Sequence, residues 1–277
     1  MDRKLLTLFS LKWNPFSMEV PVAAIYRTPA TDSFCWRIEN VLIKEGGFGL
    51  ISGDPGTGKS VCLRVLSNVL SQIPELSVAV LTHPTSNLGD FYREMGEAFG
   101  VNLRPTNRWS GFKNLRERWI SHLESTLLRP VLLIDEAQEM HNSVLNELRI
   151  LSSMHFDSKL ILTVIFAGDN RLVNKLDQPD LLPLQSRIRV RLHQGPANRE
   201  DLHLCLAHAM GEAGNINLMT RELSEAIVDH SAGNYRAMMT LSNELLMEGA
   251  RQEKDHLDEK LFFEIFGATR KKSSRST

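Results

Sequence analysis

The octapeptide GDPGTGKS at residues 53–60 constrains the fold more than any other feature of the chain. It matches the pattern G-x-x-x-x-G-K-[ST], follows directly on an apolar run at residues 48–52 and opens a helical periodicity over residues 60–73. A glycine-rich turn in this setting can point backbone N–H groups inward, and the dipole of the following helix adds to their attraction for phosphate oxygens. The pattern therefore predicts a strand, a phosphate-binding loop and a helix in direct succession.

Two side chains of this loop have expected roles. Lys59 would reach the β- and γ-phosphates, and the hydroxyl of Ser60 would hold Mg²⁺. A carboxylate turned inward would repel phosphate, so we expect Asp54 to face solvent. The alternative is a chance glycine-rich turn, which the flanking strand, the helix and a second motif argue against. The expected nucleotide-binding residues are Gly53, Asp54, Pro55, Gly56, Thr57, Gly58, Lys59, Ser60 and Val61.

The second motif, VLLIDEAQ at residues 131–138, places two adjacent carboxylates where a buried strand ends. Beside a phosphate-binding loop, Asp135 is expected to coordinate Mg²⁺ through water, and Glu136 to orient and activate an attacking water. Taken alone, the two acids could instead complement the dipole at a helix N-terminus. Together the motifs predict a site that binds ATP and Mg²⁺ and hydrolyses ATP, with Lys59 and Glu136 among its catalytic residues.

Short apolar runs alternate with helical periodicity from residue 34 to residue 195, which is typical of βα units on a parallel sheet. Buried strands are predicted at residues 48–52, 77–82, 130–135 and 160–168, and a half-solvated strand, with alternating basic and apolar residues, at 189–193. Helices are predicted between them at residues 60–73, 88–99, 113–128 and 143–154. After Gly195 and Pro196 the periodicity is helical only.

These patterns predict an α/β fold in which a five-stranded parallel sheet between helices is followed by a small all-helical lid. We expect four parts: an N-terminal segment at 1–33 packing near the nucleotide site, a core at 34–196, the lid at 197–267 and a tail at 268–277. The tail ends in RKKSSRST, which holds four basic residues and no apolar one, so it is expected to be disordered.

The composition narrows the classes of function. The 32 Lys and Arg residues against 33 Asp and Glu give a net charge of −1, which argues against binding nucleic acid through bulk positive charge but leaves room for a local basic stripe. Cys35, Cys62 and Cys205 form no C-x-x-C pair and indicate neither a disulfide framework nor a zinc site. No stretch approaches the roughly 20 apolar residues of a membrane span, and no signal peptide is evident, so we expect a cytoplasmic protein without membrane contact.

The two nucleotide motifs together resemble those of the AAA+ ATPases, and this resemblance implies further site residues. The segment AGDNRL at 167–172 stands where that family has the sensor 1 residue beside the γ-phosphate, which implies Asp169 or Asn170. A plain βα turn is the alternative, because Gly-Asp-Asn suits one. In AGNYRAM at 232–238, Arg236 is implied as sensor 2, which would touch the γ-phosphate; an ordinary surface arginine is the alternative.

The same resemblance implies an arginine finger in the segment LQSRIRVRL. Such a finger reaches the nucleotide of a neighbouring subunit and stabilises charge on the transferred phosphoryl group. Arg187 is the expected finger, so a homo-oligomer is implied. Arg189 and Arg191 fit the solvated face of an edge strand, or a nucleic-acid contact, better than a catalytic role.

Within the AAA+ family the chain resembles the ExeA-type ATPases, which are grouped with the TniB, TnsC and MuB transposition regulators. The resemblance rests on Phe9 to Phe16 (F-x-L-x-x-x-P-F), GGFGLISGDPGTGKS, LTHPT, LIDEAQ and GNYRAM. It implies a regulator of DNA transposition that assembles with ATP on duplex DNA as a ring or helical filament, selects target DNA and recruits or activates a DDE transposase. Hydrolysis would drive disassembly. The alternatives are a secretion or cell-envelope ATPase, disfavoured because no membrane span or further domain is seen, and a replication-type helicase loader, disfavoured because no winged helix follows the lid.

Residues 102–119 are the candidate DNA-contacting segment, because basic and aromatic side chains alternate there. Arg104, Arg108 and Lys113 are the expected phosphate contacts. The alternative is that Phe112, Trp119 and Leu123, which recur at helical spacing, belong to the core and leave the arginines on a solvated face. The basic tail could add affinity for DNA or bind the transposase, or could simply be a solvated end.

Overall fold

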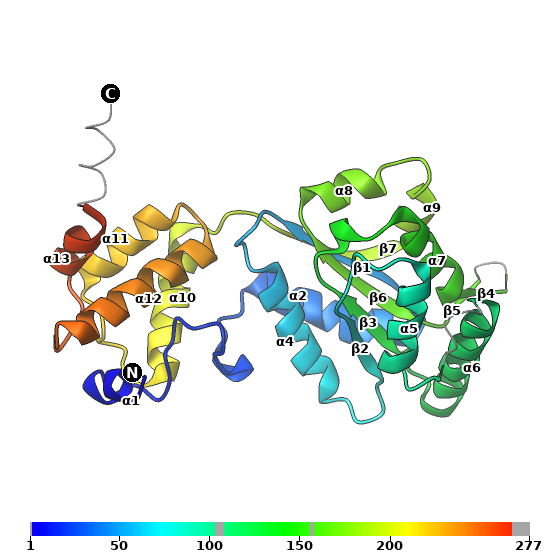
Figure 1. The fold of residues 1–277 in the computed structure, drawn as a ribbon, viewed down its shortest axis with the longest axis horizontal. Coiled ribbons are helices and arrows are strands. Elements are labelled where there is room, and N and C mark those ends of the chain that lie inside the picture. Colours follow the sequence, from blue (N-terminus) through cyan, green and yellow to red (C-terminus); the bar gives the residue numbers. More distant parts are fainter. Residues whose placement is uncertain (1, 103–107, 156–157, 268–277) are drawn as a thin grey trace. The chain divides into compact units, whose positions relative to one another are not determined.

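A computed structural model describes residues 2–102, 108–155 and 158–267 (Figure 1). These divide into two compact units. The sheet unit holds residues 29–55 and the described residues of 59–194, and the helical unit holds residues 2–28, 56–58 and 195–267. Residues 1 and 268–277 lie outside the described chain, as do 103–107 and 156–157.

The sheet unit alternates strands and helices along the chain. Its strands are β1 (Gly47–Gly53), β2 (Val78–Leu81), β3 (Val131–Ile134), β4 (Ser153–Met154), β5 (Lys159–Leu160), β6 (Thr163–Gly168) and β7 (Ile188–Gln194). Its helices are α2 (Pro29–Arg37), η2 (Ile38–Leu42), α3 (Ile43–Glu45), α4 (Lys59–Ser71), α5 (Leu88–Ala98), α6 (Arg108–Thr126), η3 (Ala137–Glu139), α7 (Asn142–Ser152), α8 (Asn170–Leu176) and α9 (Leu182–Gln185).

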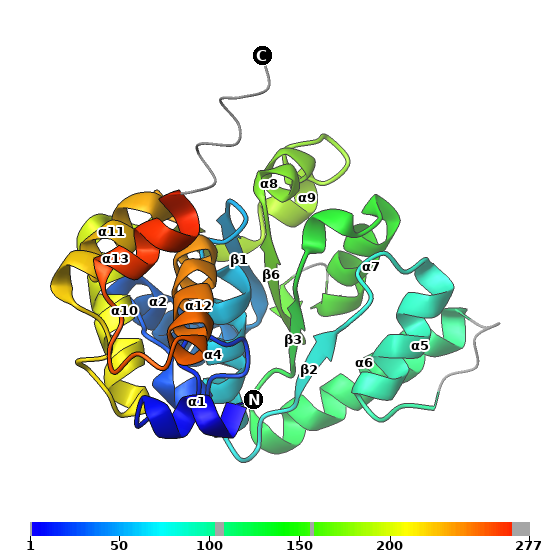
Figure 2. The same cartoon turned by 60° about the vertical axis from the view of Figure 1, so that its left-hand side comes forward.

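Five strands form one parallel sheet in the order β2-β3-β6-β1-β7 (Figure 2). All residues of β1, β3 and β6 are buried, because helices cover both faces of a parallel sheet. β7 instead alternates buried Ile188, Val190 and Leu192 with exposed Arg189 and Arg191. The expected α/β class with a five-stranded parallel sheet followed by helices is confirmed.

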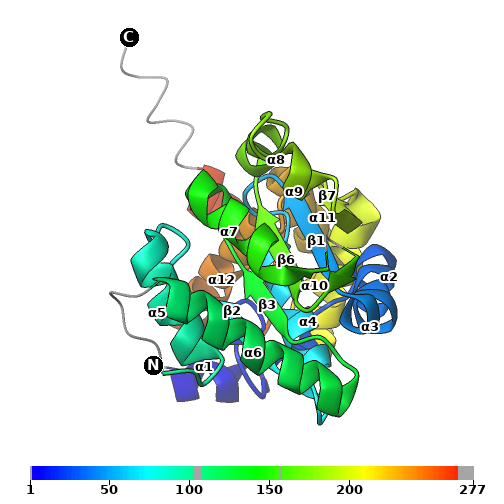
Figure 3. The ribbon, with the colours of Figure 1, turned by 90° about the vertical axis from the view of Figure 1, so that its right-hand side faces the viewer.

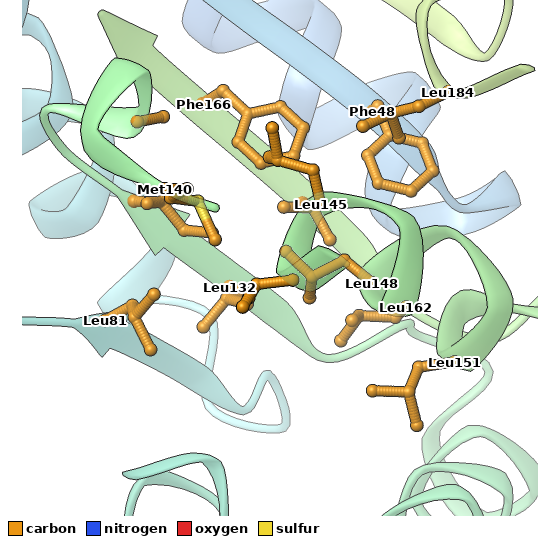
Figure 4. Packing of buried hydrophobic residues seen from close by; sticks show 14 of the residues in the cluster. Phe48, Leu81, Leu132, Met140, Leu145, Leu148, Leu151, Leu162, Phe166 and Leu184 are labelled. Carbon is orange, nitrogen blue, oxygen red and sulfur yellow. The ribbon is translucent and has the colours of Figure 1, made fainter. Parts of the chain in front are cut away.

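The main core lies between one face of the sheet and α5, α6 and α7, which pack side by side (Figure 3). Leu145 and Leu148 of α7 are fully buried and face Leu132 of β3 and Phe166 of β6 (Figure 4). Phe48 stacks on Phe166 with ring centroids 5.9 Å apart. This packing holds β1, β3 and β6 in a rigid layer whose carboxyl ends carry the polar residues of the site.

The helical unit consists of α1 (Asp2–Leu8), η1 (Val22–Ala24), α10 (Arg199–Ala213), α11 (Arg221–Ser231), α12 (Tyr235–Arg251), α13 (Glu259–Phe262) and η4 (Phe263–Gly267). Side-chain caps fix where its long helices begin: Asn198, Thr220 and Asn234 each accept a hydrogen bond from a backbone N–H in the first turn. Its core combines residues from α10 to α13 with Phe9 and Phe16 from the N-terminal segment.

Residues 2–28 belong to the helical unit: the N–H of Lys12 donates to the carbonyl of Ala213 at 2.8 Å, and Asn215 Nδ2 donates to the carbonyl of Phe9 at 2.9 Å. Two expected elements differ from those in the structure. Helix α6 begins at Arg108 rather than at residue 113. The run 160–168 splits into β5, which pairs with β4 in a small antiparallel ribbon, and β6.

Candidate functional site

Three neighbouring strands bring the polar segments of both motifs to one edge of the sheet. β6 pairs with β1 on one side and with β3 on the other, and Phe166 of β6 lies level with Leu50 and Ile134. Each strand ends within a few residues of this level, so the segments that follow them meet at the same edge. Asp54 follows β1, Asp135 follows β3 and Asp169 follows β6.

The lysine of the first motif bonds back to the start of the loop after β1. Lys59 is buried, with 7% of its surface exposed, and its Nζ donates to the carbonyl oxygen of Asp54 at 3.0 Å. Ser60, on the first turn of α4, is exposed, and Val61 beside it is 44% exposed. Asp54 is exposed as expected, and its Oδ1 also accepts a hydrogen bond from Asn170 Nδ2 at 2.9 Å.

The tip of this loop, residues 56–58, belongs to the helical unit. Gly56 and Gly58 have φ of 85° and 101°, values that residues with a Cβ rarely adopt. A Cβ on Gly56 would lie 2.2 Å from Oδ1 of Asn234, so the position also requires glycine for space. The N–H of Arg236, on the exposed first turn of α12, donates to the carbonyl of Gly56 at 3.3 Å. Thr57 is buried.

The two acids after β3 differ in their backbone. Asp135 continues from the strand and is half-buried, whereas Glu136 has left-handed backbone angles (φ 50°, ψ 38°) and is exposed. The N–H of Glu136 donates to Oδ1 of Asp135 at 2.9 Å. A left-handed conformation is uncommon for a residue with a Cβ and persists where surrounding contacts hold it.

The two candidates for sensor 1 make different contacts. The carboxylate of Asp169 caps α8, accepting from the N–H of Arg171 at 2.8 Å, and also binds the guanidinium of Arg171. Asn170 is exposed and its amide reaches Asp54 in the loop after β1. Asn170 is therefore the one whose side chain extends across the edge of the sheet toward the phosphate-binding loop.

The arginines near the end of the sheet unit have separate surroundings. Arg187 lies half-buried between α9 and β7. Arg189 forms an ion pair with Glu45, and Arg191 donates to the carbonyl of Gln185 at 3.3 Å. Arg189 and Arg191 are on the exposed face of β7, as expected for an edge strand. The role of Arg187 as the finger stays a prediction.

The candidate DNA-contacting segment is only partly described. Arg104 lies outside the described residues, and Arg108 is the first residue of α6. Lys113 is exposed, 3.7 Å from Glu117. Trp119 and Leu123 are buried in the main core, which agrees with the core alternative for those two side chains. Trp109 remains 74% exposed and stacks on Phe112.

Sequence reasoning missed two residues that support these segments. Arg116 is not a surface residue: its Nη1 donates to the carbonyls of Leu151 at 2.8 Å and Ser153 at 2.6 Å, where α7 ends. Gln138 is buried, and its side chain bonds to both Glu136 and the backbone of Asp169. The signal for Gln138 was its place in LIDEAQ, two residues after the second acid.

The donor set at this edge suits a nucleoside triphosphate with a divalent cation. A helix N-terminus and a lysine favour phosphate oxygens, while a hydroxyl and a carboxylate are the oxygen ligands that Mg²⁺ prefers. Ser60 and Asp135 supply those oxygens from the segments after β1 and β3, which β6 separates. The residues present therefore fit ATP and Mg²⁺.

Solved structures share this architecture. The Cdc6p protein of Pyrobaculum aerophilum has a TM-score of 0.69 at 16% identity, over 88% of this chain and 67% of that chain. The ORC2 protein of Aeropyrum pernix (ADPNP-ADP complexes) has a TM-score of 0.67 at 16% identity, over 90% of this chain and 70% of that one. The ORC1 protein of the same organism, in complex with DNA, has a TM-score of 0.65 at 15% identity, over 95% of this chain and 68% of that chain. At these identities the likeness concerns the fold.

Residues 42–176 match the family model described as AAA domain. The chain has the P-loop AAA+ fold. The chain is also 30% identical over 210 residues to General secretion pathway protein A of Aeromonas hydrophila. The aligned part is 74% of this chain and 37% of that protein. The chain thus spans well under half the length of this relative. Within residues 2–102, 108–155 and 158–267, no helix combines the length and apolar character that crossing a membrane requires.

Proposed function

We propose that this AAA+ protein binds and hydrolyses ATP at the carboxyl edge of the sheet. The observation that carries the proposal is the convergence there of Lys59, Asp135 and Glu136 from the segments after β1 and β3. Lys59 and the backbone N–H groups of residues 53–61 hold the phosphates, and Ser60 and Asp135 hold Mg²⁺. When bound, Mg²⁺ would supply positive charge that offsets the negative charge of the phosphate oxygens.

In this mechanism the chain's own residues position the water and read the terminal phosphate. Glu136 accepts a hydrogen bond from the attacking water and orients it. A general base in such a position typically raises the rate by about 10²–10⁴-fold. Asn170 is the proposed sensor 1, because its amide can exchange Asp54 for a phosphate oxygen. Arg236 is the proposed sensor 2, and Arg187 is the proposed finger that acts on the nucleotide of a neighbouring subunit.

The finer proposal is a DNA-dependent regulator of transposition. ATP-bound subunits assemble on duplex DNA as a ring or helical filament, select target DNA and recruit or activate a DDE transposase, and hydrolysis disassembles them. Its support is the resemblance to the TniB, TnsC and MuB group, together with the basic and aromatic residues of segment 102–119, among them Lys113 and Trp109 on the described surface. Arg104 and Arg108 are the further proposed phosphate contacts.

The second candidate is an ATPase module of a secretion or cell-envelope complex. The similarity to General secretion pathway protein A over 210 residues favours it. Such a module would use the same nucleotide chemistry but would bind protein partners in place of DNA. The two candidates therefore share every residue of the nucleotide site and differ only in what the ATP-bound form assembles on.

One experiment separates the candidates. Sedimentation and electron microscopy are carried out with and without a non-hydrolysable ATP analogue and duplex DNA, at low salt because phosphate contacts weaken as salt rises. The transposition proposal expects assemblies that need both ATP analogue and DNA. Absence of nucleotide-dependent assembly on DNA would refute it and favour the secretion-type module.

Two variants test the shared nucleotide site. Lys59→Ala is expected to lose nucleotide binding and assembly together, and a normal ATP affinity in this variant would refute the assignment of the loop. Glu136→Gln is expected to bind ATP normally, to slow turnover by about 10²-fold or more and to trap the assembled form. Hydrolysis at the wild-type rate would remove Glu136 from its proposed role.

A further inference from the structure

Gln138 is a buried amide to which the nucleotide chemistry above gives no role. It lies in the short turn η3, immediately after the two acids, and 5% of its surface is exposed. A buried amide is costly unless both its donor and its acceptor are satisfied. Both are satisfied here, and by two different segments of the carboxyl edge of the sheet.

The donor end holds the carboxylate of Glu136. Nε2 of Gln138 donates to Oε2 of Glu136 in a short hydrogen bond. The backbone of Glu136 is fixed separately, through its left-handed turn and the bond from its N–H to Asp135. Without the amide, an exposed glutamate samples several rotamers, and fixing it would cost side-chain entropy in the reaction. The bond from Gln138 removes that freedom in advance.

The acceptor end reaches the turn after β6. Oε1 of Gln138 accepts from the N–H of Asp169 at 3.3 Å, and a Cβ on Gly168 would lie only 2.7 Å from Oε1. The main chain of η3 is anchored as well, since Nζ of Lys175 donates to the carbonyls of Gln138 at 2.6 Å and Met140 at 2.8 Å. The amide is therefore held between α8 and the acids by contacts at both ends.

We propose that Gln138 is a positioning residue, which sets the carboxylate of Glu136 and couples it to the segment that carries Asn170. The inference rests on the proposed hydrolytic role of Glu136. A chain of contacts runs from Glu136 through Gln138 to Asp169, and the next residue, Asn170, bonds to Asp54 at 2.9 Å. A movement of the phosphate-binding loop thus reaches the water-orienting carboxylate through the side-chain amides of Asn170 and Gln138.

Only an amide of this length meets both demands. Glutamine presents an N–H₂ donor and a carbonyl acceptor on one planar group. A glutamate at position 138 would keep the acceptor for Asp169 but set a carboxylate against Glu136, and a methionine would offer neither bond. These two substitutions have nearly the same size as glutamine, so they separate the hydrogen bonds from the packing.

The test measures single-turnover ATP hydrolysis, the affinity for an ATP analogue and the melting temperature of full-length Gln138→Met and Gln138→Glu. Both variants are expected to lose about tenfold or more in hydrolysis rate, because a slightly misplaced catalytic group costs up to about 10²-fold. The affinity for the ATP analogue should stay within about twofold of the wild-type value, because the loss is confined to the chemical step. Gln178→Met is the matched control. Gln178 is exposed, its side-chain Oε1 accepts a hydrogen bond from Asn142 at 3.2 Å, and the substitution should leave the rate unchanged.

A double-mutant cycle distinguishes positioning from general support of the fold. In the Glu136→Gln background, Gln138→Met should cause little further loss, because both changes act on one interaction. An equal loss in both backgrounds would overturn the proposal, and so would a wild-type rate in Gln138→Glu. A failure of the proposed ATPase function would give a different result: the wild-type protein would hydrolyse no ATP, or the Glu136→Gln variant would hydrolyse it at the normal rate. In that case the proposal for Gln138 would fail together with the proposed function.

Discussion

Arg116 offers a direct test of which basic residues in segment 102–119 support the fold. Its guanidinium donates to three carbonyls where α7 ends, those of Ile150 at 3.2 Å, Leu151 at 2.8 Å and Ser153 at 2.6 Å. Burial lowers the pKa of Arg116 below its ordinary value, but an arginine stays charged at neutral pH. Arg116→Met keeps an unbranched apolar side chain in place of the arginine stem and removes every donor.

The expected cost follows from these contacts. Hydrogen bonds from a charged donor contribute about 1.5–3 kcal/mol net, and a cation at a helix C-terminus adds about 0.3–1 kcal/mol. We therefore expect Arg116→Met to lower the free energy of unfolding of the sheet unit by about 2–4 kcal/mol. For a unit of this size that corresponds to a fall in melting temperature of about 5–15 °C.

The assay is urea and thermal unfolding followed by circular dichroism, with hydrogen exchange of the α7 amides to localise the loss. Arg118→Met is the matched control, since Arg118 is exposed two residues along the same helix. The control should change stability by no more than about 0.5 kcal/mol. Equal stability of the two variants would refute the reasoning, because it would mean that the three carbonyls gain nothing from Arg116.

Two further outcomes are expected. Gly168→Ala should lower the free energy of unfolding by about 1–3 kcal/mol and should also lower the rate of ATP hydrolysis. The reason is that the added Cβ would lie 2.7 Å from Oε1 of Gln138 and from Cδ2 of Leu172. Calorimetry and single-turnover assays measure the two effects, and an unaffected rate would contradict the prediction. Burial, reinforced by the charge of Asp201, raises the pKa of the Cys205 thiol from 9.0 to about 12. Alkylation of this thiol should therefore remain slow up to pH 10 in the folded protein. Mass spectrometry of the labelled peptide measures the rate, and rapid labelling at pH 9 would contradict the prediction.

The sheet could be predicted from the sequence because its strands are buried on both faces. Continuous apolar runs before Asp54 and Asp135 mark β1 and β3, and the alternation of basic and apolar residues marks β7 at the edge. Strands of two residues, such as β4 and β5, are too short to show any period, so their ribbon was not predicted.

The nucleotide-binding loop and the acids could be predicted because their chemistry is carried by adjacent residues. The partners that orient them could not, because these come from remote segments. The contact between Asn170 and Asp54 joins residues 116 positions apart, and the three acceptors of Arg116 lie 34 to 37 positions away. Likewise, no local pattern reveals that Phe9 packs among helices that begin at Arg199.

The edges of the sheet bear on how such a protein can assemble without aggregating. Unpaired strand edges invite indiscriminate pairing between chains, and charge, short length or a covering helix each prevents it. β7 carries Arg189, Arg191 and His193 on its exposed face and packs against α2, while β2 at the other edge is only four residues long. Backbone pairing between sheets is thereby discouraged at both edges. In the proposed assembly, subunits that gather under the control of a nucleotide would then join through side-chain surfaces, whose contacts can be released again.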